Sequence, residues 1–112
     1  MKLITKVIQT KLENNYKVAS ETGEYVPVVL KLFGGSNKTW LITEMEPDGD
    51  TLRGLCDIGM GCCEYGTVSL SQLAQVRFKP FGLGIERDRY FQENTVQYFR
   101  NYYNENGTLN GC

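Results

Sequence analysis

The sequence comprises 112 residues with a formal net charge of −1 and 22% charged residues, which are ordinary values for one globular domain covering residues 1–112. Domains that bind DNA or RNA are usually basic, so this balance disfavours a nucleic acid as the direct partner. The chain contains no histidine, which excludes Ser–His and Cys–His catalytic pairs and the HExxH zinc motif.

The beginning of the chain has neither the pattern of a signal peptide nor that of a membrane span. Lys2, Lys6 and Lys11 interrupt every apolar run. No stretch approaches the roughly 20 apolar residues that a bilayer-spanning helix needs. We therefore expect a cytoplasmic protein without a membrane partner.

The first predicted elements are a helix followed by a run of strands. Apolar residues recur at helical spacing over residues 3–13, with Thr5 as a candidate N-cap and Asn14–Asn15 as the end of the helix. Four segments rich in β-forming residues then follow, separated by turns that contain glycine; they lie at 26–33, 39–45, 51–57 and 65–68. In the second segment, strict alternation places Glu44 on the face of Trp40 and Ile42, opposite the face of Leu41, Thr43 and Met45.

The second half of the chain is predicted to contain a short helix, a strand and a last helix. Ser69 can cap a helix that continues to residue 76, because Gln72 stands at the capping-box position. After Pro80, the alternation of Phe81, Leu83 and Ile85 predicts a strand that buries these three side chains.

The last helix is expected over residues 95–103, followed by an Asn- and Gly-rich tail, 104–112, that we expect to be flexible. The complete order predicts an α+β fold. It has an antiparallel meander of about four to five strands with an N-terminal helix, a short middle helix and a C-terminal helix.

The segment Gly82-Leu83-Gly84-Ile85-Glu86-Arg87 has some likeness to a phosphate-binding loop. A dinucleotide fingerprint would need a third glycine where Arg87 stands, so we interpret the segment as a strand that ends in an ion-pair cluster. In this interpretation Glu86 and Arg87 brace neighbouring segments. The alternative is a functional motif formed by Glu86, Arg87 and Asp88.

An acidic segment occupies the middle of the chain, with Arg53 as its only basic residue. Its acids are Glu44, Glu46, Asp48, Asp50, Asp57 and Glu64. The order of the acids around Gly49 does not match an EF-hand loop. We interpret the segment as a solvated hairpin tip. The alternative is a patch of Glu44, Glu46, Asp48 and Asp50 that meets a basic partner. The sequence cannot show whether Glu44 and Glu64 form a catalytic carboxylate pair.

Aromatic residues crowd the C-terminal quarter of the chain. They are Tyr90, Phe91, Tyr98, Phe99, Tyr102 and Tyr103. Val96, Phe99 and Tyr103 form one helical stripe, which we expect to dock on the sheet. Tyr98 and Tyr102 form a neighbouring stripe that can contact a protein partner.

The cysteine pattern predicts reduced thiols and no metal site. Cys56, Cys62, Cys63 and Cys112 lack the paired spacing of a zinc site. We expect no structural disulfide, metal or cofactor.

Several short motifs together resemble a known family. They are Leu3-Ile4-Thr5-Lys6, Lys31-Leu32-Phe33, Thr39-Trp40, Thr43-Glu44, Glu64-Tyr65-Gly66, Ser69-Leu70-Ser71-Gln72-Leu73 and Gly82-Leu83-Gly84-Ile85-Glu86-Arg87-Asp88. In this combination the chain resembles a small domain-of-unknown-function family that is encoded on plasmids, integrative elements and phages. The resemblance implies a context in which small proteins disarm host defence by binding a protein.

Two hypotheses on function follow from these observations. The first is a mobile-element-encoded binding protein that modulates a host protein, for example as an anti-restriction or anti-CRISPR factor. The alternative is a small hydrolase that uses Glu86 with Arg87. The sequence leaves open whether the protein forms homo-oligomers.

Overall fold

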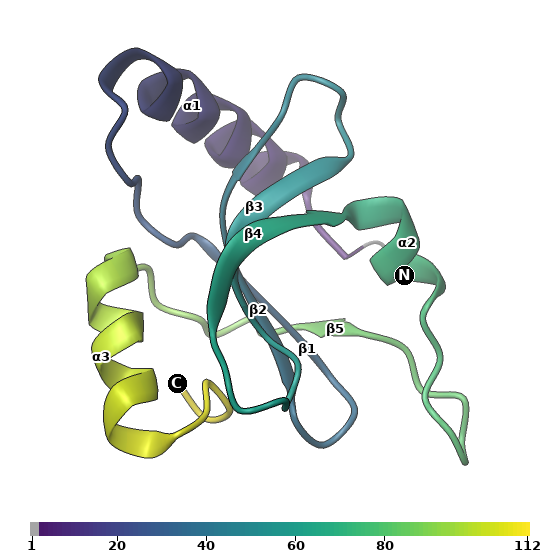
Figure 1. Ribbon diagram of the computed structural model, residues 1–112. Helices are drawn as coiled ribbons and strands as arrows, with labels where there is room; N and C mark the ends of the chain where they lie inside the picture. The colour runs from purple at the N-terminus through teal and green to yellow at the C-terminus, as the bar shows by residue number, and fades with distance from the viewer. Residues whose placement is uncertain (1–2) are drawn as a thin grey trace.

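A five-stranded antiparallel sheet forms the centre of the computed structural model, which describes residues 3–112 (Figure 1). The elements are α1 (Lys6–Thr22), β1 (Leu30–Gly34), β2 (Lys38–Met45), β3 (Thr51–Asp57), β4 (Glu64–Ser69), α2 (Leu70–Gln75), β5 (Glu86–Arg87) and α3 (Val96–Asn106). The strand order is β4-β3-β2-β1-β5, so the first four strands form a meander and β5 joins it beside β1. The α+β fold predicted from the sequence is confirmed.

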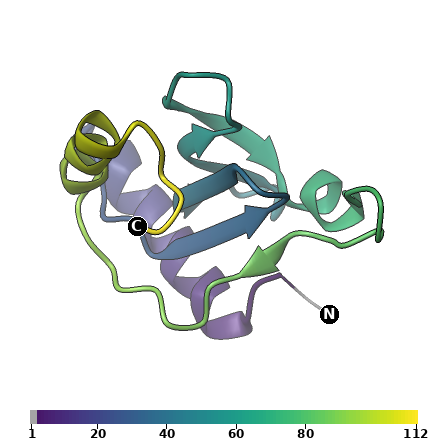
Figure 2. The same cartoon turned by 90° about the horizontal axis from the view of Figure 1, so that it is seen from below.

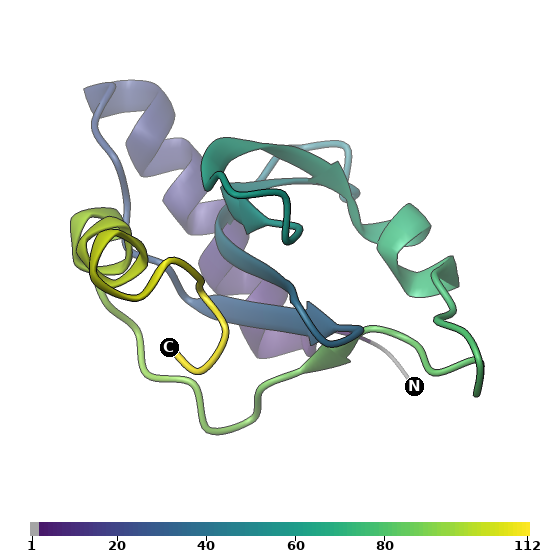
Figure 3. The ribbon, with the colours of Figure 1, turned by 60° about the horizontal axis from the view of Figure 1, so that its bottom comes forward.

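The core is divided between the two faces of the sheet. One apolar cluster contains Leu12 of α1 together with Leu30, Leu32 and Ile42 of the sheet. A second cluster joins Leu41 and Leu55 of the sheet to Val96, Phe99 and Leu109, from α3 and the chain that follows it. Thus α1 covers one face and α3 covers part of the other, while α2 lies at the end of the molecule away from α3 (Figures 2 and 3). In residues 3–112, no helix is long and apolar enough to cross a membrane.

The first helix is longer than the sequence predicts. Thr5 is its N-cap as expected, because its Oγ1 accepts a hydrogen bond from the Ile8 N–H at 3.2 Å. The helix continues through Asn15, whose side-chain amide donates to the Thr43 carbonyl at 2.9 Å. This tertiary bond gives the asparagine a role inside the helix, which therefore ends only at Gly23, with a positive φ of 71°.

A β-bulge in β2 reverses the predicted facing of two side chains. The register against β3 shifts between Ile42 and Glu44. Thr43 keeps its predicted place on the face of Leu41, and the extra residue turns Glu44 to this same face, so both lie within hydrogen-bonding distance of the Tyr65 hydroxyl. Met45 then joins Ile42 in the cluster below α1. The strict alternation predicted for this strand is therefore wrong beyond Thr43.

The predicted strand after Pro80 is also largely wrong. Only Glu86 and Arg87 pair with β1, opposite Phe33 and Leu32. Because β1 ends at Gly34, the residues before Ile85 extend past the edge of the sheet and have no strand to pack on. Of the three residues expected to be buried, only Ile85 is buried.

The last helix and the segment after it are more firmly attached than expected. The Thr95 hydroxyl caps α3, and Val96 and Phe99 are buried against the sheet as predicted. We define the C-terminal tail as residues 107–112. Leu109 within it is fully buried, and its N–H donates to Asp57 Oδ2 at 2.9 Å. This packing departs from the flexible tail that the composition suggests.

Candidate interaction surface

Two acids of the predicted patch hold the β2–β3 hairpin and the start of α2. The Asp48 carboxylate accepts hydrogen bonds from the Thr51 hydroxyl at 2.6 Å and from two backbone N–H groups of the turn. Asp50 accepts from the Ser69 hydroxyl at 2.6 Å and from the Ser71 N–H at 2.8 Å. The bonds from Thr51 and Ser69 lower the pKa of Asp48 and Asp50, respectively. Both acids therefore have structural roles at the hairpin.

The other two acids of the patch lie next to Arg53. Glu44 is 3% exposed, and its carboxylate lies 3.4 Å from the Tyr65 hydroxyl and 3.9 Å from the Arg53 guanidinium. Burial raises its pKa, although Arg53 opposes this shift. Glu46 forms the closer ion pair with Arg53, at 3.1 Å. The buried Glu44 is therefore not part of a surface that a basic partner could reach.

The structure does not bring Glu44 and Glu64 together. In the strand register, Glu44 of β2 lies opposite Arg53 of β3. Arg53 in turn lies opposite Thr67, which is three residues along β4 from Glu64. Glu64 also precedes Tyr65 on the strand, so the two side chains point to opposite faces. Because Tyr65 faces Glu44, Glu64 faces away from it.

The predicted motif at Glu86, Arg87 and Asp88 lies beside an open depression of about 510 Å³. The Arg87 guanidinium donates to the Leu3 carbonyl at 2.8 Å, so it braces the start of the chain. Asp88 accepts from the Tyr90 N–H at 2.9 Å, and Glu86 is exposed. The predicted bracing role of Arg87 therefore has a partner, but that partner is a backbone carbonyl rather than the expected acid.

The two tyrosines of the predicted partner-binding stripe have different surroundings. Tyr98 is 51% exposed, with its ring edge-on to Phe99 at 5.0 Å between centroids. Tyr102 is half-buried, and its hydroxyl donates to the Asn110 carbonyl at 3.4 Å. Only Tyr98 thus presents a large part of its ring to a partner.

The largest departure from sequence-based expectation is a projecting loop that we call the arm, residues 78–83 (Figures 1 and 3). The Phe78 N–H donates to the Leu83 carbonyl at 2.8 Å and closes the loop, while Gly82 has a positive φ of 66°. Phe81 is 82% exposed and Leu83 is 64% exposed. Two neighbouring apolar side chains at a projecting tip are typical of an interaction site.

A turn signal in the sequence could have indicated the arm. Pro80, Gly82 and Gly84 stand at alternate positions, and this composition is typical of turns rather than strands. The apolar alternation of Phe81, Leu83 and Ile85 obscured that signal, because a period of two also describes a strand.

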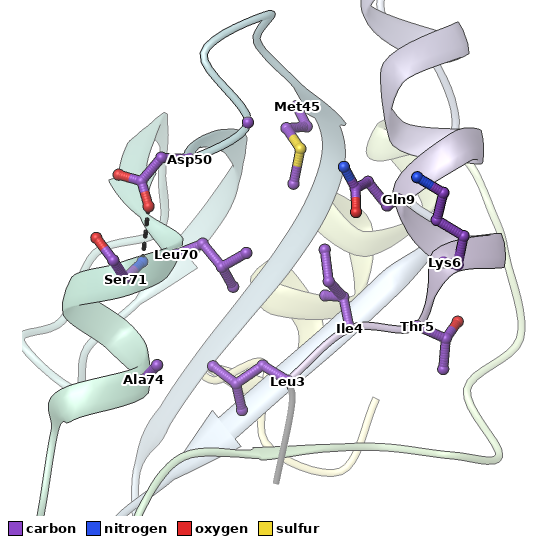
Figure 4. A pocket seen from close by; sticks show the side chains of 11 residues that line it. Leu3, Ile4, Thr5, Lys6, Gln9, Met45, Asp50, Leu70, Ser71 and Ala74 are labelled. Carbon is purple, nitrogen blue, oxygen red and sulfur yellow. Dashed lines mark hydrogen bonds between the residues drawn. The ribbon is translucent and has the colours of Figure 1, made fainter.

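An apolar cleft leads to the base of the arm. Leu3, Ile4, Met45 and Leu70 line a space of about 480 Å³ between the start of α1 and α2, with the bonded Asp50 and Ser71 at its rim (Figure 4). Leu3 and Ala74 also line a second depression, of about 300 Å³, that extends to Leu83. The cleft and the arm are therefore neighbouring parts of one surface.

The four cysteines are free thiols in different environments. Burial raises the pKa of Cys56 to about 11 and also raises the pKa of Cys63 and Cys112. Cys62 is exposed. Within residues 3–112, no group of three or more Cys, Asp or Glu residues has an arrangement that could hold a metal ion.

Comparisons with known proteins identify a family without a described activity. The model of the family described as "Protein of unknown function (DUF2958)" matches residues 3–109. Neither the comparison with curated proteins nor that with solved structures gave a significant match. The match confirms the expected membership of a domain-of-unknown-function family. Because it spans nearly the whole sequence, the chain belongs to the DUF2958 family.

Proposed function

We propose that the protein is a non-enzymatic binding module that contacts another protein through the arm. The exposure of Phe81 and Leu83 carries this proposal. A side chain as large as phenylalanine is normally buried in the fold or in an interface, and aromatic residues often dominate the binding free energy of interfaces. The backbone bond between Phe78 and Leu83 holds the tip in shape, which lowers the entropic cost of binding.

The contacts around Glu86 favour binding over the alternative of a small hydrolase. Arg87 and Asp88 each bond to the backbone of their own chain, which supports a structural role for both side chains. A catalytic acid usually has a perturbed pKa within a concave site. Glu86 is exposed at the side of an open depression, and substrate cannot reach Glu44, whose pKa is raised by burial, because it is 3% exposed.

We further propose that the partner is a host protein and that the protein is encoded on a mobile element. The resemblance to families of plasmids, integrative elements and phages supports this context. A small domain that covers a functional surface of a restriction or CRISPR component would act as a host-defence inhibitor without chemistry of its own.

Photo-crosslinking tests the proposed interface. A benzophenone amino acid is placed at position 81, and a matched control carries it at Tyr90, which is 91% exposed on another part of the surface. In host lysate, we expect the probe at position 81 to crosslink to one discrete protein. Excess unlabelled wild-type protein should abolish this crosslink, whereas excess Phe81→Ser protein should not.

Equal crosslinking from positions 81 and 90, or equal competition by wild-type and Phe81→Ser protein, would contradict the arm as the interface. A hydrolytic activity of the purified protein that Glu86→Gln abolishes would favour the alternative function. Thermal melts of each variant show whether the fold is retained.

A further inference from the structure

The arm is surrounded by positive charge. Arg77 precedes it, Lys79 lies within it, and the Lys38 Nζ lies 5.9 Å from the centroid of the Phe78 ring. In the described chain, the ion pairs involve Lys11 and Arg53, so none of these three cations is neutralised by a carboxylate within 4.0 Å. The surroundings of the arm are therefore cationic, although the chain as a whole has a net charge of −1.

The geometry holds one of these charges at the base of the arm. Arg77 Nη1 donates to the carbonyls of Ala74 and Val76 at 3.0 and 2.7 Å, which attaches the guanidinium to the end of α2. The Lys79 side chain is exposed and can reach a partner that covers the tip. Glu86 lines the same depression as Arg77 but forms no ion pair with it within 4.0 Å.

We propose, resting on the function proposed above, that the arm recognises a protein surface in which an apolar pocket is rimmed by carboxylates. Phe81 and Leu83 would enter the pocket, and Lys79 would meet the acidic rim. Opposite charges around a buried apolar contact accelerate association and exclude wrong partners.

The composition of the arm favours a protein over other anionic partners. Single-stranded nucleic acids require several stacking aromatics within a basic groove, whereas the arm exposes one phenylalanine on a chain of net charge −1. Stable attachment to an anionic membrane requires a larger apolar face or a cluster of about four or more lysines and arginines, more than the cations named around the arm. Two apolar side chains beside one exposed lysine match the core and rim of a small protein interface.

A peptide selection tests the chemistry of the partner. The probe is a phage library of random linear and disulfide-looped peptides, selected against the full chain and counter-selected against Phe81→Ser. We expect enriched peptides that combine apolar residues with flanking Asp or Glu. Their affinity should fall with added salt, and Lys79→Glu should weaken it about tenfold.

The matched control is Lys17→Glu, which changes the net charge equally at an exposed position on α1. It should change the affinity by less than about twofold, because charges separated by more than a Debye length are screened. A selection that enriches nothing, or that enriches neutral or basic peptides, would overturn the inference. Equal effects of Lys79→Glu and Lys17→Glu would overturn it as well.

Two further probes separate this inference from the proposed function. Two probes are tested separately for binding that depends on Phe81: vesicles that contain phosphatidylserine, and a single-stranded oligonucleotide. Binding of either probe would replace the acidic protein as the partner. If crosslinking depends on Phe81 but peptide binding does not depend on Lys79, only the charge inference fails. If nothing depends on Phe81, the proposed function fails with it.

Discussion

The arm, residues 78–83, and the C-terminal tail, residues 107–112, are short segments of equal length with opposite environments. Each contains glycine and has a large apolar residue near its middle, Phe81 or Leu109. Phe81 is 82% exposed, whereas Leu109 is fully buried. The composition suggested the reverse for both, since the tail was expected to be flexible and the arm to be a buried strand.

The difference shows that burial depends on what the fold places opposite a residue. Leu109 returns across the sheet to the second apolar cluster, where Phe99 and Leu55 contribute to its surroundings and Asp57 accepts its N–H. Phe81 lies beyond the end of β1 and has no surface of the chain to cover. An apolar residue in the arm thus remains accessible to a partner.

The largest expected effect on stability comes from truncating the apolar residue of each segment in turn. Leu109→Ala should lower the free energy of unfolding by about 2–4 kcal/mol, because it leaves a cavity in the core. Phe81→Ala should change it by less than about 0.5 kcal/mol, because the side chain is exposed. Urea unfolding of both variants measures the contrast, and similar losses would show that the two segments do not differ in packing.

The anchor of the tail can be removed separately from its apolar contact. Asp57 is buried and accepts hydrogen bonds from the N–H groups of Leu109 and Gly59 at 2.9 and 3.0 Å. Asp57→Ala should cost about 1–3 kcal/mol, because the buried Leu109 N–H loses its acceptor. Glu105→Ala, at an exposed position of α3, is the control. Denaturant melts that show equal stability for the two variants would argue against anchoring by Asp57.

Thiol labelling reports whether the tail opens. Cys112 is half-buried and burial raises the pKa of its thiol, so it should react with iodoacetamide more slowly than the exposed Cys62 at neutral pH. Leu109→Ala should accelerate labelling of Cys112 about tenfold by increasing local opening. Peptide mass spectrometry over time distinguishes the sites. Equal labelling of Cys62 and Cys112 in the wild type would indicate a tail that is open in solution.

The smallest expected effect concerns a glycine next to the arm. A β-carbon at Gly84 would come within 3.2 Å of Arg77 Nη1 and 3.6 Å of the Val76 carbonyl. The first neighbour is the end of a flexible side chain, so Gly84→Val should cost less than about 1 kcal/mol. The control is Gly54→Ala, whose β-carbon would lie 1.9 Å from the Leu41 carbonyl and should be strongly destabilising in the same urea melts.

Much of the fold could be predicted from local sequence. Residues 51–57 form the third strand as expected, and the Ser69 hydroxyl caps α2 by accepting from the Gln72 N–H at 3.3 Å. The face of α3 that carries Val96 and Phe99 docks on the sheet as its spacing indicates. These features depend on residues within one or two turns of each other, so neighbouring sequence is enough to specify them.

The candidate site could not be predicted in the same way. The acids singled out from the sequence are present, but Asp48 and Asp50 hold a turn and a helix start, and Glu44 is buried because a bulge at Thr43 redirects it. The arm was missed because its apolar alternation describes a buried strand only if another strand lies beside it. Periodicity gives the spacing of side chains but does not show whether a neighbour exists.

The sequence by itself therefore determined the α+β class, most of the strands and the N-caps of α1 and α2, because hydrogen bonds and periodicities within a few residues control them. Only the tertiary structure decided the length of α1, which the bond from Asn15 to Thr43 permits, and the burial of Leu109, which Asp57 and the sheet provide. It also decided the exposure of Phe81, because β1 ends before it could pair with the arm. These outcomes depend on contacts between residues distant in the chain, and such contacts exist only after the whole sheet has formed.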